Sequence, residues 1–382
     1  MQSLPRSVYI HVPFCLHHCG YCDFTLVANR NDLIPQWLEC LRRELEHELA
    51  DYPRPIEVDT VFLGGGTPTH LATDQLVLLF ELLASFLQPV AGAEISIEAN
   101  PDGLTTEKLH VLRNHGVTRI SLGVQSFQNP ELRILERTHR ADEGAEAVCR
   151  AAEYISQVGV DLIFAVPGQT LSSWEDSLRT AISLPVHHIS IYGLTWEQGT
   201  PFFRRERRGV LQKTSEDLEC QMYLNAISML QRHGFEHYEV SNFAKFSSRC
   251  RHNLVYWRAE EYFAFGPGAA RYVNGRRSTN CRSVLHWMKA WIASHPCSEP
   301  DEFTDPDDRA REAIMLGLRL REGFSLDDFQ RRFGVSVENL AGSALKRSLN
   351  QGLTEIVSDW LRLTEAGLLI ADSVVSDFLV AD

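Results

Sequence analysis

Three cysteines lie within eight positions near the start of the chain, in the segment Cys15-Leu16-His17-His18-Cys19-Gly20-Tyr21-Cys22. Three thiols cannot all pair as disulfides with one another, but at this spacing their sulfur atoms can meet at one point. Thiolates are soft ligands that suit zinc or iron–sulfur clusters. Structural zinc usually takes four ligands from two close pairs, and the sequence has no second such pair. The pattern therefore favours a cubane cluster with one open iron, with incidental cysteines as the alternative.

Composition limits the class of protein. A chain of 382 residues has room for one barrel-sized domain and a smaller one, and 44% hydrophobic residues predict a well-filled core. The net charge of −13 opposes broad electrostatic binding to nucleic acid. The nine cysteines are odd in number and mostly scattered, which favours a reducing compartment. Because no apolar run is long enough to span a membrane or to form a signal peptide, we expect a cytoplasmic protein.

Short apolar runs alternate with longer segments of helical period through the first 245 residues. The predicted strands are Val8–Val12, Thr60–Leu63, Glu94–Glu98, Arg119–Val124, Val160–Val166 and His188–Tyr192. The predicted helices between and after them are Leu33–Tyr52, Thr73–Phe86, Thr105–His115, Ala141–Ser156, Ser173–Ser183 and Ser215–His233. This alternation predicts a parallel sheet covered by helices, either as a doubly wound sheet or as a β/α barrel.

The remainder of the chain has a different character. Residues 246–297 are predicted as a linking region, loop-like at least to Thr279 and rich in aromatic residues and glycine. Residues 298–382 are predicted as a small, mostly helical domain that resembles a winged helix, with Asp305 and Pro306 starting a helix and Ser325 capping another. Its many acidic residues argue against DNA binding. The predicted divisions are therefore 1–245, 246–297 and 298–382.

Polar or glycine-rich segments follow several predicted strands. The segment Gly64-Gly65-Gly66-Thr67-Pro68-Thr69 lets the backbone approach a ligand, although a tight turn explains it equally well. It is not a phosphate-binding loop, because no Lys-Ser or Lys-Thr follows. Glu98 and Gln125 lie at strand ends, and Asp161 enters the fifth strand, where an unpaired charge among apolar neighbours is costly. Arg137 is a candidate partner for a carboxylate. The alternative for Glu98 is a helix-cap carboxylate, and for Gln125, Arg137 and Asp161 it is a structural ion pair.

At this point the sequence resembles the radical S-adenosylmethionine (SAM) superfamily, whose mark is CxxxCxxC. The resemblance implies a three-quarter, (β/α)6 TIM-like barrel in which Cys15, Cys19 and Cys22 hold a [4Fe–4S] cluster. It also implies that the open iron binds SAM and that an electron donor supplies the cluster. The family positions that contact SAM or lie near the cluster correspond to Tyr9, Tyr21, Gly65, Gly66, Thr67, Glu98, Gln125, Arg137 and Asp161.

The order of these motifs resembles the anaerobic coproporphyrinogen III oxidase subfamily over nearly the entire chain. Two departures matter: Phe24 stands where the oxidase has a further cysteine, and the segment before Cys15 is short. Both favour the related haem chaperones, the HemW proteins, which bind haem and are thought to hand it to acceptor proteins. Their HNxxYW element corresponds to His252-Asn253-Leu254-Val255-Tyr256-Trp257.

The resemblance links His252 to haem, and imidazole is a standard axial ligand of haem iron. A structural histidine in a loop is the alternative, and Cys250 is a competing ligand. We therefore predict a haem chaperone with haem and haem-accepting proteins as partners, and association with membranes only through those acceptors. The alternative is a radical SAM enzyme acting on a tetrapyrrole as an oxidase, methyltransferase or ring-opening enzyme. A barrel whose cluster is merely structural is a third interpretation.

Overall fold

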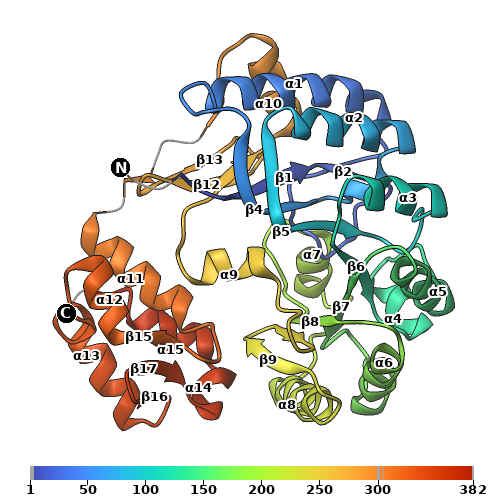
Figure 1. Ribbon diagram of the computed structural model, residues 1–382. Coiled ribbons are helices and arrows are strands. Elements are labelled where there is room, and N and C mark those ends of the chain that lie inside the picture. Colours follow the sequence, from blue (N-terminus) through green and yellow to red (C-terminus); the bar gives the residue numbers. More distant parts are fainter. Residues whose placement is uncertain (1–3, 299–301, 304, 381–382) are drawn as a thin grey trace.

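Six parallel strands form the centre of the molecule. The computed structural model describes residues 4–298, 302–303 and 305–380. The six strands lie side by side in chain order, each parallel to the next (Figure 1). They are β1 (Ser7–Val12), β4 (Ile56–Gly65), β5 (Leu87–Ala99), β6 (Arg119–Gln125), β7 (Gln157–Phe164) and β8 (His188–Gly193).

Helices connect these strands, and two further helices follow the last of the six strands (Figure 1). They are α1 (Ile34–Glu48), α2 (Thr73–Ala84), α3 (Thr106–Asn114), α4 (Asn129–Ile134), α5 (Ala141–Ala152), α6 (Leu171–Ser183), α7 (Pro201–Arg207) and α8 (Glu216–Arg232). The nine-stranded sheet begins at β11 and ends at β9, and these two strands do not pair with each other, so it does not close. The prediction of a partial (β/α)6 barrel is therefore confirmed.

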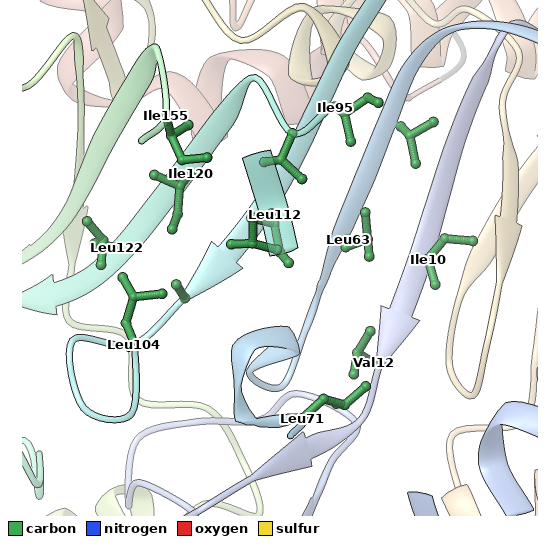
Figure 2. Packing of buried hydrophobic residues seen from close by; sticks show 14 of the residues in the cluster. Ile10, Val12, Leu63, Leu71, Ile95, Leu104, Leu112, Ile120, Leu122 and Ile155 are labelled. Carbon is green, nitrogen blue, oxygen red and sulfur yellow. The ribbon is translucent and has the colours of Figure 1, made fainter. Parts of the chain in front are cut away.

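Apolar side chains of the strands and helices form one continuous core. Strand β1 is buried at every position except Tyr9, as expected for a parallel strand covered on both faces. Figure 2 shows Ile10, Leu63 and Ile120 of three strands and Leu112 of α3 among the side chains of this core. Complete burial of each such side chain contributes about 1.5–3 kcal/mol. The core thus fixes the strands whose carboxyl ends carry the predicted site.

The prediction that residues 246–279 form a loop is wrong. This segment contains α9 (Arg251–Trp257), β11 (Phe263–Phe265), β12 (Ala270–Val273) and β13 (Arg276–Thr279), and α10 (Val284–Ile292) follows. Strand β11 pairs in parallel with β1, and the tryptophans of α10 join the barrel core beside α1. A three-residue strand is too short to show a period in the sequence, which explains the error. The hairpin of β9 (Glu236–Glu239) and β10 (Asn242–Ala244) extends the other edge.

The C-terminal part has its own hydrophobic core, and Figure 1 shows it to one side of the barrel. It contains α11 (Pro306–Gly317), β15 (Phe324–Ser325), α12 (Leu326–Phe333), α13 (Val337–Asn350), β16 (Thr354–Val357), β17 (Trp360–Leu363), α14 (Glu365–Leu369) and α15 (Ala371–Asp377). Asp305 and Ser325 cap α11 and α12 as predicted. The smaller helical domain is confirmed, whereas the boundaries at 245 and 297 stay predictions. None of the helices among the described residues is both long and apolar enough to cross a bilayer.

Candidate functional site

The three clustered cysteines lie in the loop that follows β1, at the carboxyl end of the sheet. Short strand β2 (Phe14–Cys15) pairs with β3 (Val27–Ala28) and closes this loop. Cys22 N–H donates to the carbonyl of Cys19 at 3.1 Å, which brings the second and third cysteines into one turn. Burial is the main cause that raises the pKa of the Cys15 and Cys22 thiols to about 11. A bound cation reverses this preference, because it stabilises thiolate over thiol.

The sulfur atoms of the three cysteines are not gathered as closely as the ligands of one metal ion. Four ligands around one tetrahedral zinc stand about 3.8 Å apart, given a Zn–S distance near 2.3 Å. Within the described part of the chain, the sulfur atoms of Cys15, Cys19 and Cys22 do not gather within 4.8 Å of one another. A cubane places its iron corners apart and so accepts thiolates that are spread more widely. The donor set therefore fits a [4Fe–4S] cluster.

The glycine turn lies directly against the cysteine loop. Gly66 N–H donates to the Val12 carbonyl at 2.9 Å, and Thr67 N–H donates to the Phe14 carbonyl at 2.8 Å. A Cβ at Gly66 would lie 2.8 Å from that same Phe14 oxygen, so no larger residue fits. Gly65 has a φ of +108°, which glycine adopts without strain. The turn thus presents backbone beside the predicted cluster position, as an approaching ligand requires.

A chain of polar contacts joins two of the cysteines through three side chains, of which Thr67 follows β4, Asn100 follows β5 and Arg137 follows α4. The Cys15 sulfur lies 3.4 Å from Thr67 Oγ1, and Asn100 Nδ2 donates to the same oxygen at 3.1 Å. Arg137 Nη2 donates to Asn100 Oδ1 at 2.7 Å, and its Nη1 donates to the Cys19 sulfur at 3.6 Å. Sequence reasoning missed Asn100, although it stands in the Glu-Ala-Asn-Pro segment that closes the third predicted strand. Its position between Thr67 and Arg137 makes it a positioning residue.

The Arg137 side chain is half-buried, and one of its donors has no protein partner in the part of the chain that the structure describes. It also donates to the Gly123 carbonyl at 2.8 Å, whereas its Nε has no partner among the described residues. A buried unsatisfied donor is costly, and an anionic ligand would satisfy it. Gln125 lies at a β-bulge with φ of +65°, and its amide lies near Gly123 beside Arg137. The structure therefore brings Gln125 and Arg137 together as predicted site residues.

Two half-buried carboxylates, Glu98 and Asp161, line a cavity of about 230 Å³ inside the barrel. Glu98 accepts a hydrogen bond from Gly65 N–H at 3.0 Å, and Asp161 accepts from Ser121 Oγ at 3.0 Å. Burial is the main cause that raises both pKa values, to about 8 for Glu98, and the Asp161 charge raises that of Glu98 further. Oxygen acceptors of this kind suit ribose hydroxyls.

Replacing Glu98 by Gln tests the electrostatic state of this cavity. A carboxyl whose pKa is raised from 4.5 to about 8 on folding stabilises the fold below pH 4.5, and this contribution is lost as the pH rises through about 8. Gln is neutral at every pH and keeps an acceptor for Gly65 N–H. Without ligand, Glu98→Gln should melt about 2–4 °C above wild type at pH 8.5, with a smaller difference at pH 5.5. A difference in melting temperature between Glu98→Gln and wild type that is the same at pH 5.5 and pH 8.5 would contradict the raised pKa of Glu98.

The two predicted aromatic residues occupy different surroundings. Tyr9 lines the 230 Å³ cavity, stacks on Phe62 and lies with its hydroxyl 3.1 Å from His11 Nδ1. Tyr21 follows the second cysteine, packs edge-on against Phe202 and lies close to the Arg137 guanidinium. Tyr9 is thus placed at the inner cavity, and Tyr21 at the cysteine loop.

The HNxxYW segment lies in α9, and this helix lines the cavity inside the barrel. Asn253 and Tyr256 line the same cavity as Glu98 and Asp161, so the structure brings this motif and the predicted SAM residues together. Glu94 accepts from the backbone N–H groups of Arg251 and His252 and so holds the start of the helix. Glu98 therefore contacts the glycine turn through Gly65 N–H and shares a cavity with α9.

The imidazole of His252 is fully buried, and both of its nitrogen atoms have partners. Nδ1 lies 2.8 Å from Thr60 Oγ1, and Nε2 lies 2.8 Å from the Tyr256 hydroxyl. Burial lowers the pKa of His252 to about 4, so the ring is neutral at physiological pH. A neutral imidazole can ligate iron, but only after one of these hydrogen bonds opens. Cys250 is also buried, and its sulfur lies 3.5 Å from Glu94 Oε1.

A second, larger cavity of about 790 Å³ lies on the opposite side of α9. It is bounded by the start of β1, the outer face of α9 and helices α11 and α12 of the C-terminal part. Thr60, which contacts His252, lines this cavity, whereas Tyr256 lines the smaller one. His252 thus lies between the two cavities. Thr60 separates it from the larger cavity, and Tyr256 separates it from the smaller one.

Comparison with known proteins gives consistent matches. The sequence matches the radical SAM superfamily over residues 9–181 and the HemN C-terminal domain over residues 304–370. It is 37% identical to the heme chaperone HemW of Bacillus subtilis over 98% of this chain and 99% of that protein. The heme chaperone HemW of Lactococcus lactis is 34% identical over 100% of this chain and 99% of its own length.

Among solved structures, the coproporphyrinogen III oxidase HemN from Escherichia coli has a TM-score of 0.86 with this chain. The match covers 98% of this chain and 90% of that one, at 21% sequence identity. At this identity the likeness demonstrates a shared fold, including the C-terminal part.

Proposed function

This chain belongs to the radical SAM superfamily, in the family of relatives named heme chaperone HemW, and we propose that it binds haem and delivers it to acceptor proteins. The observation that carries the proposal is the position of α9. This helix, which includes His252, separates the polar barrel interior from a cavity with the volume of a ligand site. In this proposal, the inner cavity with Glu98 and Asp161 and the outer cavity that would hold haem lie on two sides of one short helix.

The barrel residues fit a cluster and SAM. Cys15, Cys19 and Cys22 would hold the cluster, and the glycine turn with Arg137 would receive the amino and carboxylate groups of SAM. When bound, the cluster supplies an electron to the sulfonium of SAM. The protein residues position these groups: Arg137 supports Cys19 and offers an unsatisfied donor, while Glu98 and Asp161 offer acceptors inside the barrel.

Size decides which cavity suits haem. Drug-sized ligands occupy pockets of about 300–1,000 Å³. The inner cavity of about 230 Å³ is too small for a tetrapyrrole, whereas the outer one of about 790 Å³ is within the range. The outer cavity also has apolar wall residues from α9, Leu254 and Val255, which suit the flat face of a porphyrin.

Charge favours the same cavity. Haem carries two propionates, and guanidinium groups pair well with carboxylates. The arginines that line the outer cavity outnumber its carboxylates; they are Arg6, Arg251, Arg258, Arg309 and Arg332, against Asp59, Glu260 and Glu261. Arg258 has a long contact of 3.9 Å to Glu322, and Arg309 Nε is buried without a partner among the described residues. Both are therefore suited to receive a propionate.

His252→Ala should weaken haem binding and change the Soret spectrum. If Nδ1 ligates the iron after Thr60 yields, removal of the imidazole should reduce affinity by about tenfold or more, and added imidazole should restore the wild-type band. The measurement is a hemin titration followed by absorbance. An unchanged titration and spectrum for His252→Ala would remove this residue from the haem site.

Two controls separate ligation from stability. Thr60→Val and Tyr256→Phe each remove one hydrogen bond of the His252 ring but keep the imidazole. Both should retain the wild-type Soret band, and Thr60→Val should bind haem at least as tightly as wild type. Arg258→Ala should weaken haem binding without rescue by imidazole, because it removes a charge and not an axial ligand. If all four variants lose the same amount of haem affinity, the loss comes from a disturbed fold and not from a missing haem ligand.

The rival function is radical chemistry on a tetrapyrrole, and the SAM-like arrangement inside the barrel is the observation that favours it. Anaerobic incubation with dithionite, SAM and coproporphyrinogen III separates the two functions. We expect no decarboxylated product beyond one equivalent of protein. Product formed in many-fold excess would overturn the chaperone proposal.

The proposed partners are proteins, and the proposed compartment is the cytoplasm. Haem-accepting proteins and an electron donor for the cluster would be the protein partners, and membranes would be reached only through acceptors. A reducing cytoplasm is supported by nine free cysteines, none of them in a disulfide. The described residues and the net charge of −13 offer no support for a nucleic-acid partner.

A further inference from the structure

Three metal-binding side chains meet at a place far in sequence from the cysteine loop. Cys281 follows β13, His286 lies in the first turn of α10, and Cys297 follows that helix. Their ligand atoms all lie within 4.8 Å of one another. Among the residues that the structure describes, this is the one group of three or more Cys, His, Asp or Glu side chains gathered so closely. Nothing in the proposed haem and SAM chemistry uses these residues.

The backbone holds the three positions together. Cys281 N–H donates to the Cys297 carbonyl at 3.1 Å, and a bridge between Asn280 and Ser298 continues this pairing. Ser283 Oγ accepts from His286 N–H and so fixes the helix start that carries the imidazole. The ends of the loop are thus paired and its middle is capped, which reduces the conformational entropy lost when a ligand binds.

The donor set selects a class of metal. Two thiolates and one imidazole are typical ligands of zinc, whereas calcium and magnesium prefer oxygen. Ligands around one tetrahedral zinc stand about 3.5–3.8 Å apart. The Cys297 sulfur is already 4.0 Å from His286 Nε2, so small side-chain rotations suffice. Cys281 and Cys297 are half-buried and His286 is exposed, which leaves the site accessible to an ion from solution.

We propose that Cys281, His286 and Cys297 bind one Zn²⁺ ion, with water as the fourth ligand. The ion would join the β13–α10 turn to the segment that leads toward the C-terminal part. Helix α10 packs in the barrel core through Trp287 and Trp291, and the Cys281 carbonyl accepts from Gly268 N–H at 3.1 Å. Zinc would therefore clip the connecting segment to the barrel, and its binding free energy would add to stability.

The test is a difference in zinc content among single variants. Full-length protein, kept reduced, is saturated with Zn²⁺, freed of excess ion and analysed for bound metal. Cys281→Ser, His286→Ala and Cys297→Ser should each bind one equivalent less than wild type, whatever the cysteine loop binds. The matched control Cys220→Ser, at an exposed cysteine on α8, should bind as wild type. Equal zinc content in all variants would overturn the proposal.

Cobalt provides a second readout that does not depend on stability. Co²⁺ added to wild type should give thiolate charge-transfer bands and the ligand-field bands of a tetrahedral site. His286→Ala should shift the ligand-field bands, and the cysteine variants should lose charge-transfer intensity. The competing chemistry is a disulfide between Cys281 and Cys297. Intact mass measurement showing this bond in protein kept with reductant, together with no zinc uptake at these residues, would also overturn the proposal.

Discussion

Replacement of Cys15, Cys19 or Cys22 by Ala should reduce the cluster iron of anaerobically reconstituted protein to about a tenth of wild type or less, because each of the three thiolates would be a ligand of the proposed cluster. The visible charge-transfer absorbance should be lost with the iron. Cys149→Ala is the matched control, since this cysteine lies exposed on α5 and should leave iron content unchanged. Full iron content in all three single variants would contradict the assignment.

A smaller effect is expected when the hydrogen-bond chain between Cys15 and Cys19 is broken. This chain passes through Thr67, Asn100 and Arg137. Asn100→Ala removes the central link but no sulfur ligand. It should therefore retain most of the cluster iron while weakening SAM binding. Loss of iron equal to that of the cysteine variants would show that the loop, and not its sulfur atoms alone, depends on Asn100.

The second large effect is expected at Arg137. Truncation of one partner of a buried, hydrogen-bonded charge pair costs about 2–5 kcal/mol, so Arg137→Ala should weaken SAM binding by about thirtyfold or more. Arg137→Lys should recover little of this loss, because an ammonium cannot replace the planar guanidinium fork that contacts Asn100 and Gly123. Calorimetric titration of the reconstituted Arg137→Ala and Arg137→Lys variants with SAM measures both affinities.

Arg140→Ala is the control for Arg137. Arg140 is a nearby exposed arginine that pairs with Asp142 on the surface, so its loss should leave SAM affinity within about twofold of wild type. If Arg137→Ala binds SAM as tightly as the control, Arg137 is a structural residue of the cysteine loop, and the SAM carboxylate has another partner.

Much of the barrel could be predicted because its signals are local. Apolar runs such as Val8–Val12 are typical of buried parallel strands, and the polar residues at their carboxyl ends must meet at one edge. For this reason the sequence predicts that Thr67, Glu98 and Gln125, which end or follow predicted strands, lie at one edge of the sheet. The caps Asp305 and Ser325 were equally visible, since capping is a property of four consecutive residues.

Features that depend on distant contacts could not be predicted. Strand β11 is three apolar residues long, and only pairing with β1 distinguishes it from a loop. The shielding of His252 by Thr60 and Tyr256 depends on β4 and α9 meeting in space. Likewise, Cys281, His286 and Cys297 have no familiar spacing and are brought together by the pairing of Asn280 with Ser298.

Transfer of haem from this protein to an apo acceptor tests the central claim most directly. Haem-loaded protein is mixed with an apo haem protein whose Soret band differs, and the acceptor spectrum is followed with and without His252→Ala. The wild-type protein should bind haem saturably at one haem per chain and then transfer it stoichiometrically to the acceptor. The His252→Ala variant should bind little haem. Absence of saturable haem binding by the wild-type chain, or haem that never leaves it for any acceptor, would contradict the account.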